Sequence, residues 1–127
     1  MSGGNIRSCL YLADRIEPGQ PLVLTEGEFD ALTAWQLGWG KLSVASIGSA
    51  SNQRINLRWH GKLLAAPRLL VCMDADEAGE KAAIEIATLS RAVKIIQVPT
   101  GKDMNEFHCI ANGPVAYDWL MSQLKHE

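Results

Sequence analysis

Short apolar runs that alternate with stretches of helical pattern constrain the fold of this chain more than any other feature. The runs occupy residues 22–25, 42–47, 68–73 and 93–98, and each has the length of a buried strand. Helical crossovers between successive strands favour a parallel sheet, and strands that are apolar throughout are covered on both faces. The sequence therefore predicts an α/β fold in which a central parallel sheet of about four strands carries helices on both faces.

Helices are predicted between and after these strands. They cover residues 28–37, 52–66, 77–91, 104–111 and 114–125. In the first of them the apolar residues recur at helical spacing, and Gly38 ends it. Pro67 ends the second helix and Pro99 closes the fourth strand, because proline cannot continue either element.

Composition narrows the class of protein. A chain of 127 residues with 47% hydrophobic and 20% charged residues has the size and balance of one globular domain. It has no apolar run of the ~18 residues that span a membrane and no apolar signal core near its N-terminus, so we expect a cytoplasmic protein without a membrane partner. Three cysteines, Cys9, Cys72 and Cys109, form no C-x-x-C pair, which argues against a zinc site or a disulfide framework.

The charge balance limits how this chain meets nucleic acid. Its 12 basic and 14 acidic residues give a net charge of −2, which excludes a polybasic nucleic-acid module. Contact with a polyanion therefore requires metal ions, a local basic patch or a partner domain.

Acidic residues follow three of the predicted strands. Glu26 comes directly after the first strand and Asp30 lies one helical turn further on; Asp74 and Asp76 follow the third strand, and Asp103 follows the fourth. The carboxyl ends of parallel strands meet at one edge of the sheet, where ligands gather. Like charges at such short distances repel one another, and a divalent cation removes that repulsion. Oxygen ligands alone favour Mg²⁺ or Mn²⁺ over zinc, which suits phosphoryl transfer or phosphodiester chemistry.

Each of these acids also has a simpler interpretation. Asp76 alone serves equally well as the N-cap of the following helix, and Asp30 alone as a surface acid. A single D-x-D spacing arises easily by chance. The combination favours a metal site, because Glu26 and Asp74 each follow an apolar strand directly. Ligands of a parallel sheet bind at that end of the strands.

Three strings in the chain resemble a known family. They are T-E-G-E-F-D-A-L-T at 25–33, D-A-D-E-A-G-E-K-A-A at 74–83 and G-K-D-M-N-E-F at 101–107. Together they resemble the Toprim domain, most closely that of bacterial primases and phage-type primase-helicases, and S-I-G-S-A-S at 46–51 resembles the second strand and loop of those proteins. The resemblance implies a Rossmann-like Toprim fold.

The resemblance also implies a domain organisation. We expect a single Toprim domain over residues 1–127, with a core at about 22–113, an N-terminal extension at 1–21 and a C-terminal helix at 114–127. We expect this domain to be a fragment of a larger protein, because the chain carries no zinc-binding cysteine set, no upstream basic subdomain and no P-loop.

Roles for individual residues follow from the matching positions. The resemblance implies that Glu26 is a catalytic acid that binds metal or transfers a proton, and that Asp74 and Asp76 are catalytic and hold the divalent ions. Asp30 and Asp103 match further metal-binding acids of the primase centre. The residues expected to contact substrate are Gly27, Lys102 and Asn105. Bacterial primases often carry a second aspartate at the position of Asn105, whereas primase-helicases resemble this chain there.

The implied activity is nucleotidyl transfer in the synthesis of RNA primers for DNA replication, with Mg²⁺ or Mn²⁺ as cofactor. The implied partners are a single-stranded DNA template, the RNA primer, nucleoside triphosphates and other domains of the parent protein. We expect the isolated domain to be inactive. Two alternatives remain open from the sequence: a Toprim-type nuclease, and a non-catalytic nucleic-acid-binding or interaction module in a replication or recombination assembly.

Overall fold

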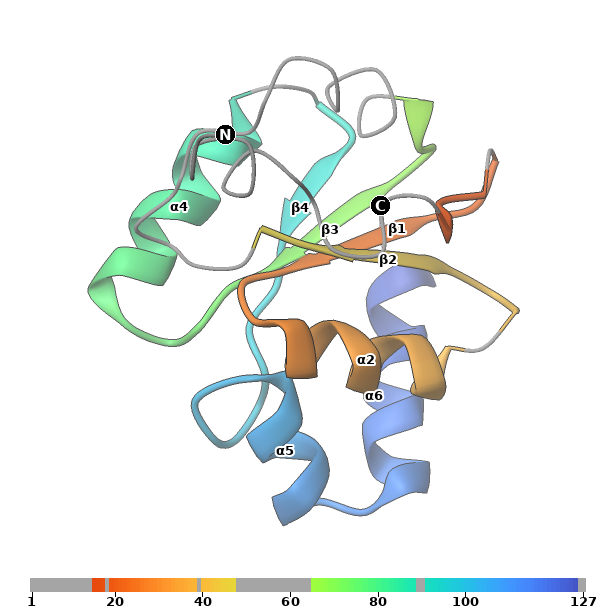
Figure 1. Cartoon of the computed structure of the whole chain (residues 1–127), viewed down its shortest axis with the longest axis vertical. Coiled ribbons are helices and arrows are strands. Elements are labelled where there is room, and N and C mark those ends of the chain that lie inside the picture. Colours follow the sequence, from red (N-terminus) through yellow and green to blue (C-terminus); the bar gives the residue numbers. More distant parts are fainter. Residues whose placement is uncertain (1–14, 18, 39, 48–64, 89–90, 126–127) are drawn as a thin grey trace, which may run out of the picture.

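A parallel sheet forms the centre of the molecule (Figure 1). The computed structural model describes residues 15–17, 19–38, 40–47, 65–88 and 91–125. Within them the strands are β1 (Leu22–Thr25), β2 (Ser43–Ser46), β3 (Leu69–Cys72) and β4 (Val93–Ile95). Their order is β2-β1-β3-β4, and every neighbouring pair is parallel. The α/β fold predicted from the apolar runs is confirmed.

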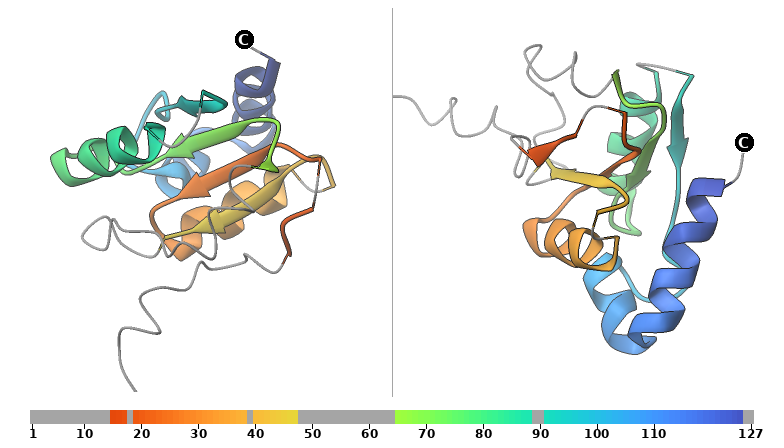
Figure 2. Two further views of the ribbon diagram at one scale, coloured as in Figure 1. Left: turned by 90° about the horizontal axis from the view of Figure 1, so that it is seen from above. Right: turned by 90° about the vertical axis from the view of Figure 1, so that its right-hand side faces the viewer.

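Helices cover both faces of this sheet, as predicted (Figure 2). They are α2 (Glu28–Leu37), α4 (Glu77–Ala87), α5 (Met104–Ile110) and α6 (Gly113–Lys125). The helix α4 packs on one face, and α2, α5 and α6 pack on the other. Among the described residues no helix combines the length and the apolar character that crossing a bilayer requires.

Alternation along the strands divides the core into two layers. Leu22 and Val71 face α4, whereas Val23 and Leu70 face α2, and all four side chains are fully buried. Successive side chains of a strand point to opposite faces, so strands covered on both sides must be apolar at every position. Burial of each such side chain stabilises the fold by about 1.5–3 kcal/mol, which explains why the apolar runs predicted the strands well.

Several elements are shorter than the sequence predicted. The fourth strand, expected at 93–98, ends at Ile95, because its partner β3 ends at Cys72 and the chain then turns towards α4. The Ile96 N–H still donates to the Val71 carbonyl at 2.9 Å, after which the chain leaves the sheet towards α5. The helix expected at 77–91 ends at Ala87. Most of the helix expected at 52–66 and most of the extension at 1–21 lie outside the described residues.

Candidate metal centre

Three aspartates from separate parts of the chain meet at the carboxyl edge of the sheet. Asp30 stands in the first turn of α2, Asp74 follows β3, and Asp103 precedes α5. One carboxylate oxygen from each lies within 4.8 Å of the other two. The Oε1 atom of Glu26, which follows β1, accepts a hydrogen bond from the Asp74 N–H at 3.2 Å. The structure thus brings together four of the five acids that the sequence indicated.

Hydrogen bonds between segments hold this arrangement in place. The Asn105 N–H donates to Asp30 Oδ1 at 2.9 Å, and the Thr33 hydroxyl donates to Asn105 Oδ1 at 3.1 Å. These two bonds join α2 to α5. The Ala75 N–H donates to the Lys102 carbonyl at 2.8 Å, which joins the loop after β3 to the loop before α5. The carboxylates are therefore positioned by backbone and side-chain contacts in advance of any ligand.

Burial and repulsion raise the pKa of two of the aspartates. The pKa of Asp74 rises to about 6, first because burial disfavours its charged form and then because of the neighbouring carboxylates. The charges that act on it belong to Glu26, Asp30, Asp103 and Asp76, and all four are negative. A cation placed among these groups would lower the pKa of Asp74 again. This set of carboxylate oxygens therefore fits a hard divalent ion.

The pKa of Asp30 also rises to about 6, and burial is again the main cause. The charge of Asp103 and a hydrogen bond with its side chain raise this pKa further, whereas the N–H groups of Asn105 and Gly27 lower it. Beneath the acids, burial raises the pKa of the Cys72 thiol to about 12, so this group stays protonated at neutral pH. Among the described residues, the group that could hold a metal ion consists of three aspartates, so the ligands it offers are carboxylate oxygens.

Asp76 lies outside the group of three. It is exposed and forms the N-cap of α4, where its Oδ1 accepts from the Gly79 N–H at 2.7 Å. The capping interpretation of this residue is therefore confirmed, while a role in binding metal stays a prediction. Asp103 belongs to the group of three and also caps α5, because its Oδ1 accepts from the Glu106 N–H at 2.8 Å.

The residues expected to contact substrate surround this centre. Lys102 is exposed and follows Gly101, whose φ of 85° gives the sharp turn before α5. Asn105 is exposed in the first turn of α5. A Cβ atom on Gly27 would lie 3.1 Å from Asp30 Oδ2, so this glycine keeps the space beside the acid open.

Sequence reasoning missed the importance of Gly79. A Cβ atom at this position would lie 2.3 Å from the Asp74 carbonyl oxygen, so only glycine lets α4 begin this close to the loop after β3. The available signal was a glycine inside the first turn of a predicted helix, where it lowers helix propensity and therefore needs a packing reason.

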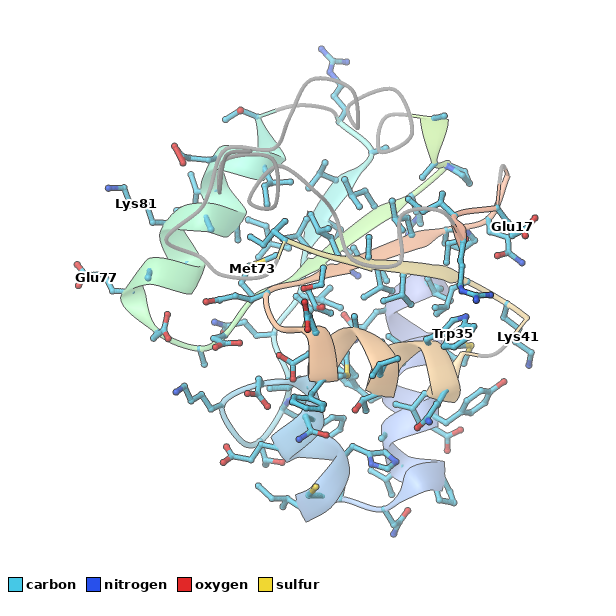
Figure 3. All side chains as sticks on the ribbon, in the orientation of Figure 1. Glu17, Trp35, Lys41, Met73, Glu77 and Lys81 are labelled. Atoms are coloured by element: carbon cyan, nitrogen blue, oxygen red, sulfur yellow. The ribbon has the colours of Figure 1, made fainter. Side chains whose placement is uncertain are left out.

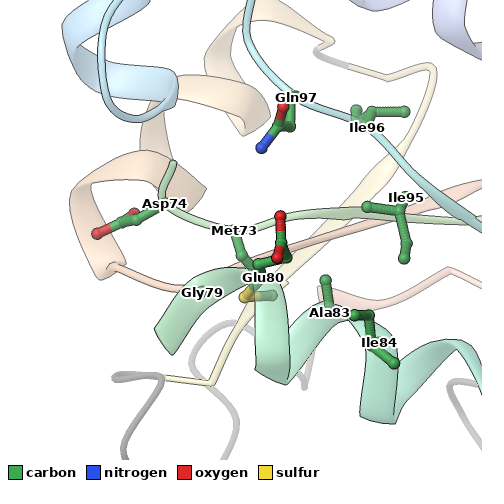
Figure 4. A pocket seen from close by; sticks show the side chains of 9 residues that line it. All are labelled: Met73, Asp74, Gly79, Glu80, Ala83, Ile84, Ile95, Ile96 and Gln97. Carbon is green, nitrogen blue, oxygen red and sulfur yellow. The ribbon is translucent and has the colours of Figure 1, made fainter. Parts of the chain in front are cut away.

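A pocket of about 430 Å³ lies beside α4 and β4 (Figure 4). Its walls are largely apolar, with Glu80 and Gln97 as the polar side chains between them. Asp74 borders one end of the pocket, but its carboxylate points away from it (Figure 4). Met73 and Ala83 of this pocket belong to the core layer on the α4 face, whereas Asp30 stands on α2 and Asp103 caps α5 on the other face.

Two aromatic rings in the described part of the chain pack against cations. Trp35 lies under the Arg15 guanidinium, 5.5 Å from the ring centroid, and the Lys41 amine lies 5.1 Å from the Tyr117 ring centroid. Figure 3 shows Trp35 and Lys41 at one side of the molecule and Met73, which precedes Asp74, towards the other. Each of these two rings thus packs against a cation of the chain.

Comparison with known proteins agrees with this geometry. The family model described as Toprim-like matches residues 23–108. A DNA helicase/primase of Enterobacteria phage T3 is 31% identical over 113 residues, which is 84% of this chain and 19% of that protein. A DNA primase of Clostridium acetobutylicum is 33% identical over 95 residues, which is 70% of this chain and 15% of that protein. This chain thus spans less than a fifth of either relative.

Solved structures give the same result. The primase fragment of the bacteriophage T7 primase-helicase superposes with a TM-score of 0.78 at 29% identity, over 93% of this chain and 49% of that one. The zinc-binding and RNA polymerase domains of the Aquifex aeolicus primase share the fold, with a TM-score of 0.62 at 23% identity, over 91% of this chain and 30% of that one. The resemblance inferred from the three sequence strings is confirmed. The chain belongs to the Toprim-like family.

Proposed function

We propose that this domain carries out metal-dependent nucleotidyl transfer during the synthesis of RNA primers, as the catalytic Toprim domain of a DNA primase or primase-helicase. The observation that carries the proposal is the group of three carboxylates within 4.8 Å of one another at the carboxyl edge of the sheet. The names of the relatives support it, because they are DNA primases and a helicase/primase.

In this proposal Asp30, Asp74 and Asp103 hold Mg²⁺ or Mn²⁺, and Asp76 lies near enough for its charge to raise the pKa of Asp74. A bound divalent ion supplies charge neutralisation and orientation of phosphate groups. The 3′ hydroxyl of the primer attacks the α-phosphorus of the incoming triphosphate; the P–O bond to the β-phosphate breaks, and pyrophosphate leaves with the bonding electrons. The carboxylates orient the reacting groups and do not form covalent bonds with them.

Three further residues complete the proposed site. Glu26 serves as a metal ligand or as the acceptor of the hydroxyl proton, since its Oε1 is positioned by the Asp74 N–H. The exposed Lys102 amine approaches the negative charge of the triphosphate. Asn105, whose Oδ1 is held by Thr33, presents its amide Nδ2 towards substrate, and among the described residues no hydrogen bond engages that atom.

The proposed partners are a single-stranded DNA template, the RNA primer, nucleoside triphosphates and further domains of a longer protein in the cytoplasm. In a related phage T7 structure, 28% identical over 94% of this chain and 61% of that one, primase domains of two subunits are bound to an RNA/DNA hybrid and dTTP. The relatives give no support to the alternatives of a nuclease or a non-catalytic module, because their names are those of primases.

Metal-dependent nucleotide binding tests the proposal. Isothermal titration of the chain with ATP is run in Mg²⁺, in Mn²⁺ and in chelator, and we expect binding only with the metals. Asp74→Asn should weaken this binding at least about tenfold, since even changes outside the ligand shell weaken metal binding that much. Asp118→Asn, which removes an exposed acid on α6, is the matched control and should bind like the wild type.

Two results would contradict the proposal. One is equal nucleotide binding by the wild type and Asp74→Asn, or binding that ignores metal. The other is metal-dependent cleavage of DNA or RNA by this chain that disappears in Glu26→Gln, which would establish phosphodiester hydrolysis instead.

A further inference from the structure

Phe29 is the most exposed of the large apolar side chains in the described part of the protein, at 76%. Single exposed apolar residues are common on protein surfaces and need no explanation by themselves. The position of this one is unusual, because it stands in the first turn of α2 directly before Asp30, whose carboxylate belongs to the metal centre. Phe29 therefore places a bare aromatic ring next to the proposed catalytic acids.

The helix geometry shows on which side of α2 this ring lies. Phe29 and Thr33 are four residues apart, so they share one side of the helix. That side faces α5, because the Thr33 hydroxyl donates to Asn105 Oδ1 at 3.1 Å. The Asn105 N–H donates in turn to Asp30 Oδ1. The ring thus stands on the side of α2 where α5 and the metal centre meet.

The combination of groups there matches the two halves of a nucleotide. Its phosphates are charged and suit a metal held by carboxylates. Its base is flat and apolar on both faces, and an exposed aromatic ring is the protein surface on which bases stack. A phenylalanine side chain offers no hydrogen bond, so stacking is the contact that it can supply to such a ligand.

We propose that Phe29 is a stacking platform for the base of the nucleoside triphosphate whose phosphates bind at the Asp30–Asp74–Asp103 centre. The inference rests on the proposed function and adds a base-binding residue to it. Every base presents a π-face, so the platform accepts purines and pyrimidines alike and leaves the choice of nucleotide to the template.

Titration with two ligands that differ in the presence of the nucleoside tests this role. The chain is titrated in Mn²⁺ with ATP and with inorganic triphosphate, and the same measurements are made on Phe29→Ala, Phe29→Trp and Ile110→Ala. Phe29→Ala should bind ATP about 5- to 150-fold more weakly and should bind inorganic triphosphate like the wild type. Phe29→Trp should retain ATP binding. Ile110→Ala, which truncates another exposed apolar residue at 61% exposure, should change neither affinity.

The outcomes separate this inference from the proposed function. If ATP and inorganic triphosphate bind the wild type equally, or if Phe29→Ala weakens both to the same extent, the stacking role is overturned while the metal centre stands. If neither ligand binds in Mn²⁺, the proposed function fails and the stacking role with it. Because Phe29 is exposed, its truncation leaves the core intact, which circular dichroism of the variant checks.

Discussion

The raised pKa values of Asp30 and Asp74 connect single residues to the chemistry of the site. Each carboxyl group has lost hydration and gained negative neighbours, so its charged form is disfavoured in the folded state. An aspartate in the unfolded chain titrates near 3.8, whereas these two titrate at about 6 when folded. Without metal the centre is therefore a local source of instability, and a bound divalent ion would make the arrangement favourable.

Removal of one of these charges should relieve the repulsion. In chelator at pH 7 we expect Asp74→Asn to be neutral or more stable than the wild type, by on the order of 1 kcal/mol. Mg²⁺ should raise the melting temperature of the wild type more than that of the variant, because a ligand that binds only the folded state stabilises that state. Thermal melts in chelator and in Mg²⁺ measure both effects. A variant that is clearly destabilised in chelator, together with a wild type that ignores Mg²⁺, would contradict this account.

The same shift predicts a dependence on pH. A folded pKa raised from 3.8 to about 6 contributes stability that is fully present below 3.8 and is lost as the pH rises through 6. The free energy of unfolding of the metal-free wild type should therefore fall between about pH 4 and about pH 6.5 relative to that of Asp74→Asn. Urea denaturation in chelator across this range gives the difference. A difference that stays constant with pH would show that Asp74 titrates normally.

At Gly79 we expect close packing to outweigh helix propensity. Alanine is the better helix former, yet its Cβ atom would lie 2.3 Å from the Asp74 carbonyl oxygen. We expect Gly79→Ala to lower the free energy of unfolding by about 1–3 kcal/mol and to weaken metal binding by displacing Asp74. Gly113→Ala is the control, because a Cβ atom there meets nothing within 4 Å. Equal stability of the two variants in urea denaturation would refute the close packing.

At the scale of elements, the first turns of α2, α4 and α5 build the rim of the site. Each of these three helices begins just after the loop that follows a strand, and each has an acid in its first turn or directly before it. The negative charges also interact favourably with the positive ends of these helices. The helix starts therefore fix the positions of the acids and offset part of their repulsion.

Asp76 should behave as a cap and thus differ from Asp74. Asp76→Ala removes the acceptor of the Gly79 N–H and should destabilise the domain by about 1 kcal/mol in chelator and in Mg²⁺ alike. Asp76→Ser keeps a capping oxygen and should restore most of that loss. Urea denaturation of the wild type, Asp76→Ala and Asp76→Ser in chelator and in Mg²⁺ measures these changes in the free energy of unfolding. If Asp76→Ala is harmless in chelator but abolishes the stabilisation by Mg²⁺, then Asp76 is a metal ligand rather than a cap.

The elements also show how far the sequence determined the outcome. The apolar runs predicted every strand of the described sheet, because burial on both faces leaves no alternative to apolar residues. They overestimated β4, whose end depends on where β3 stops and not on its own sequence. The meeting of Asp30, Asp74 and Asp103 followed from the rule for parallel sheets. The spacing allowed Asp76 to be either a cap or a metal ligand, because that choice depends on loop dihedral angles that spacing does not encode.

At the scale of the whole molecule, the domain presents an acidic centre on a chain of net charge −2. It covers 49% of the T7 primase fragment that it resembles. A chain with this charge attracts neither template nor triphosphate by its overall field, so metal ions, a local basic patch or a partner domain must supply the attraction.

Primer synthesis should therefore be absent from the purified chain. With a single-stranded template, all four nucleoside triphosphates and Mg²⁺ or Mn²⁺, we expect no template-directed products on a sequencing gel. The T3 helicase/primase serves as the positive control under the same conditions. Robust synthesis by the 127 residues alone would show that this domain also contains the template site that we assign to other domains.

Paramagnetic relaxation by Mn²⁺ tests the central claim, a divalent metal site formed by Asp30, Asp74 and Asp103, most directly. In amide spectra of the wild type, Mn²⁺ should broaden the signals of Gly27, Ala75 and Lys102 first and leave those of α6 sharp. The double variant Asp30→Asn, Asp74→Asn should lose this broadening, whereas Glu85→Gln, which changes an exposed acid of α4, should retain it. Broadening that is equal in the wild type and the double variant would contradict the metal site.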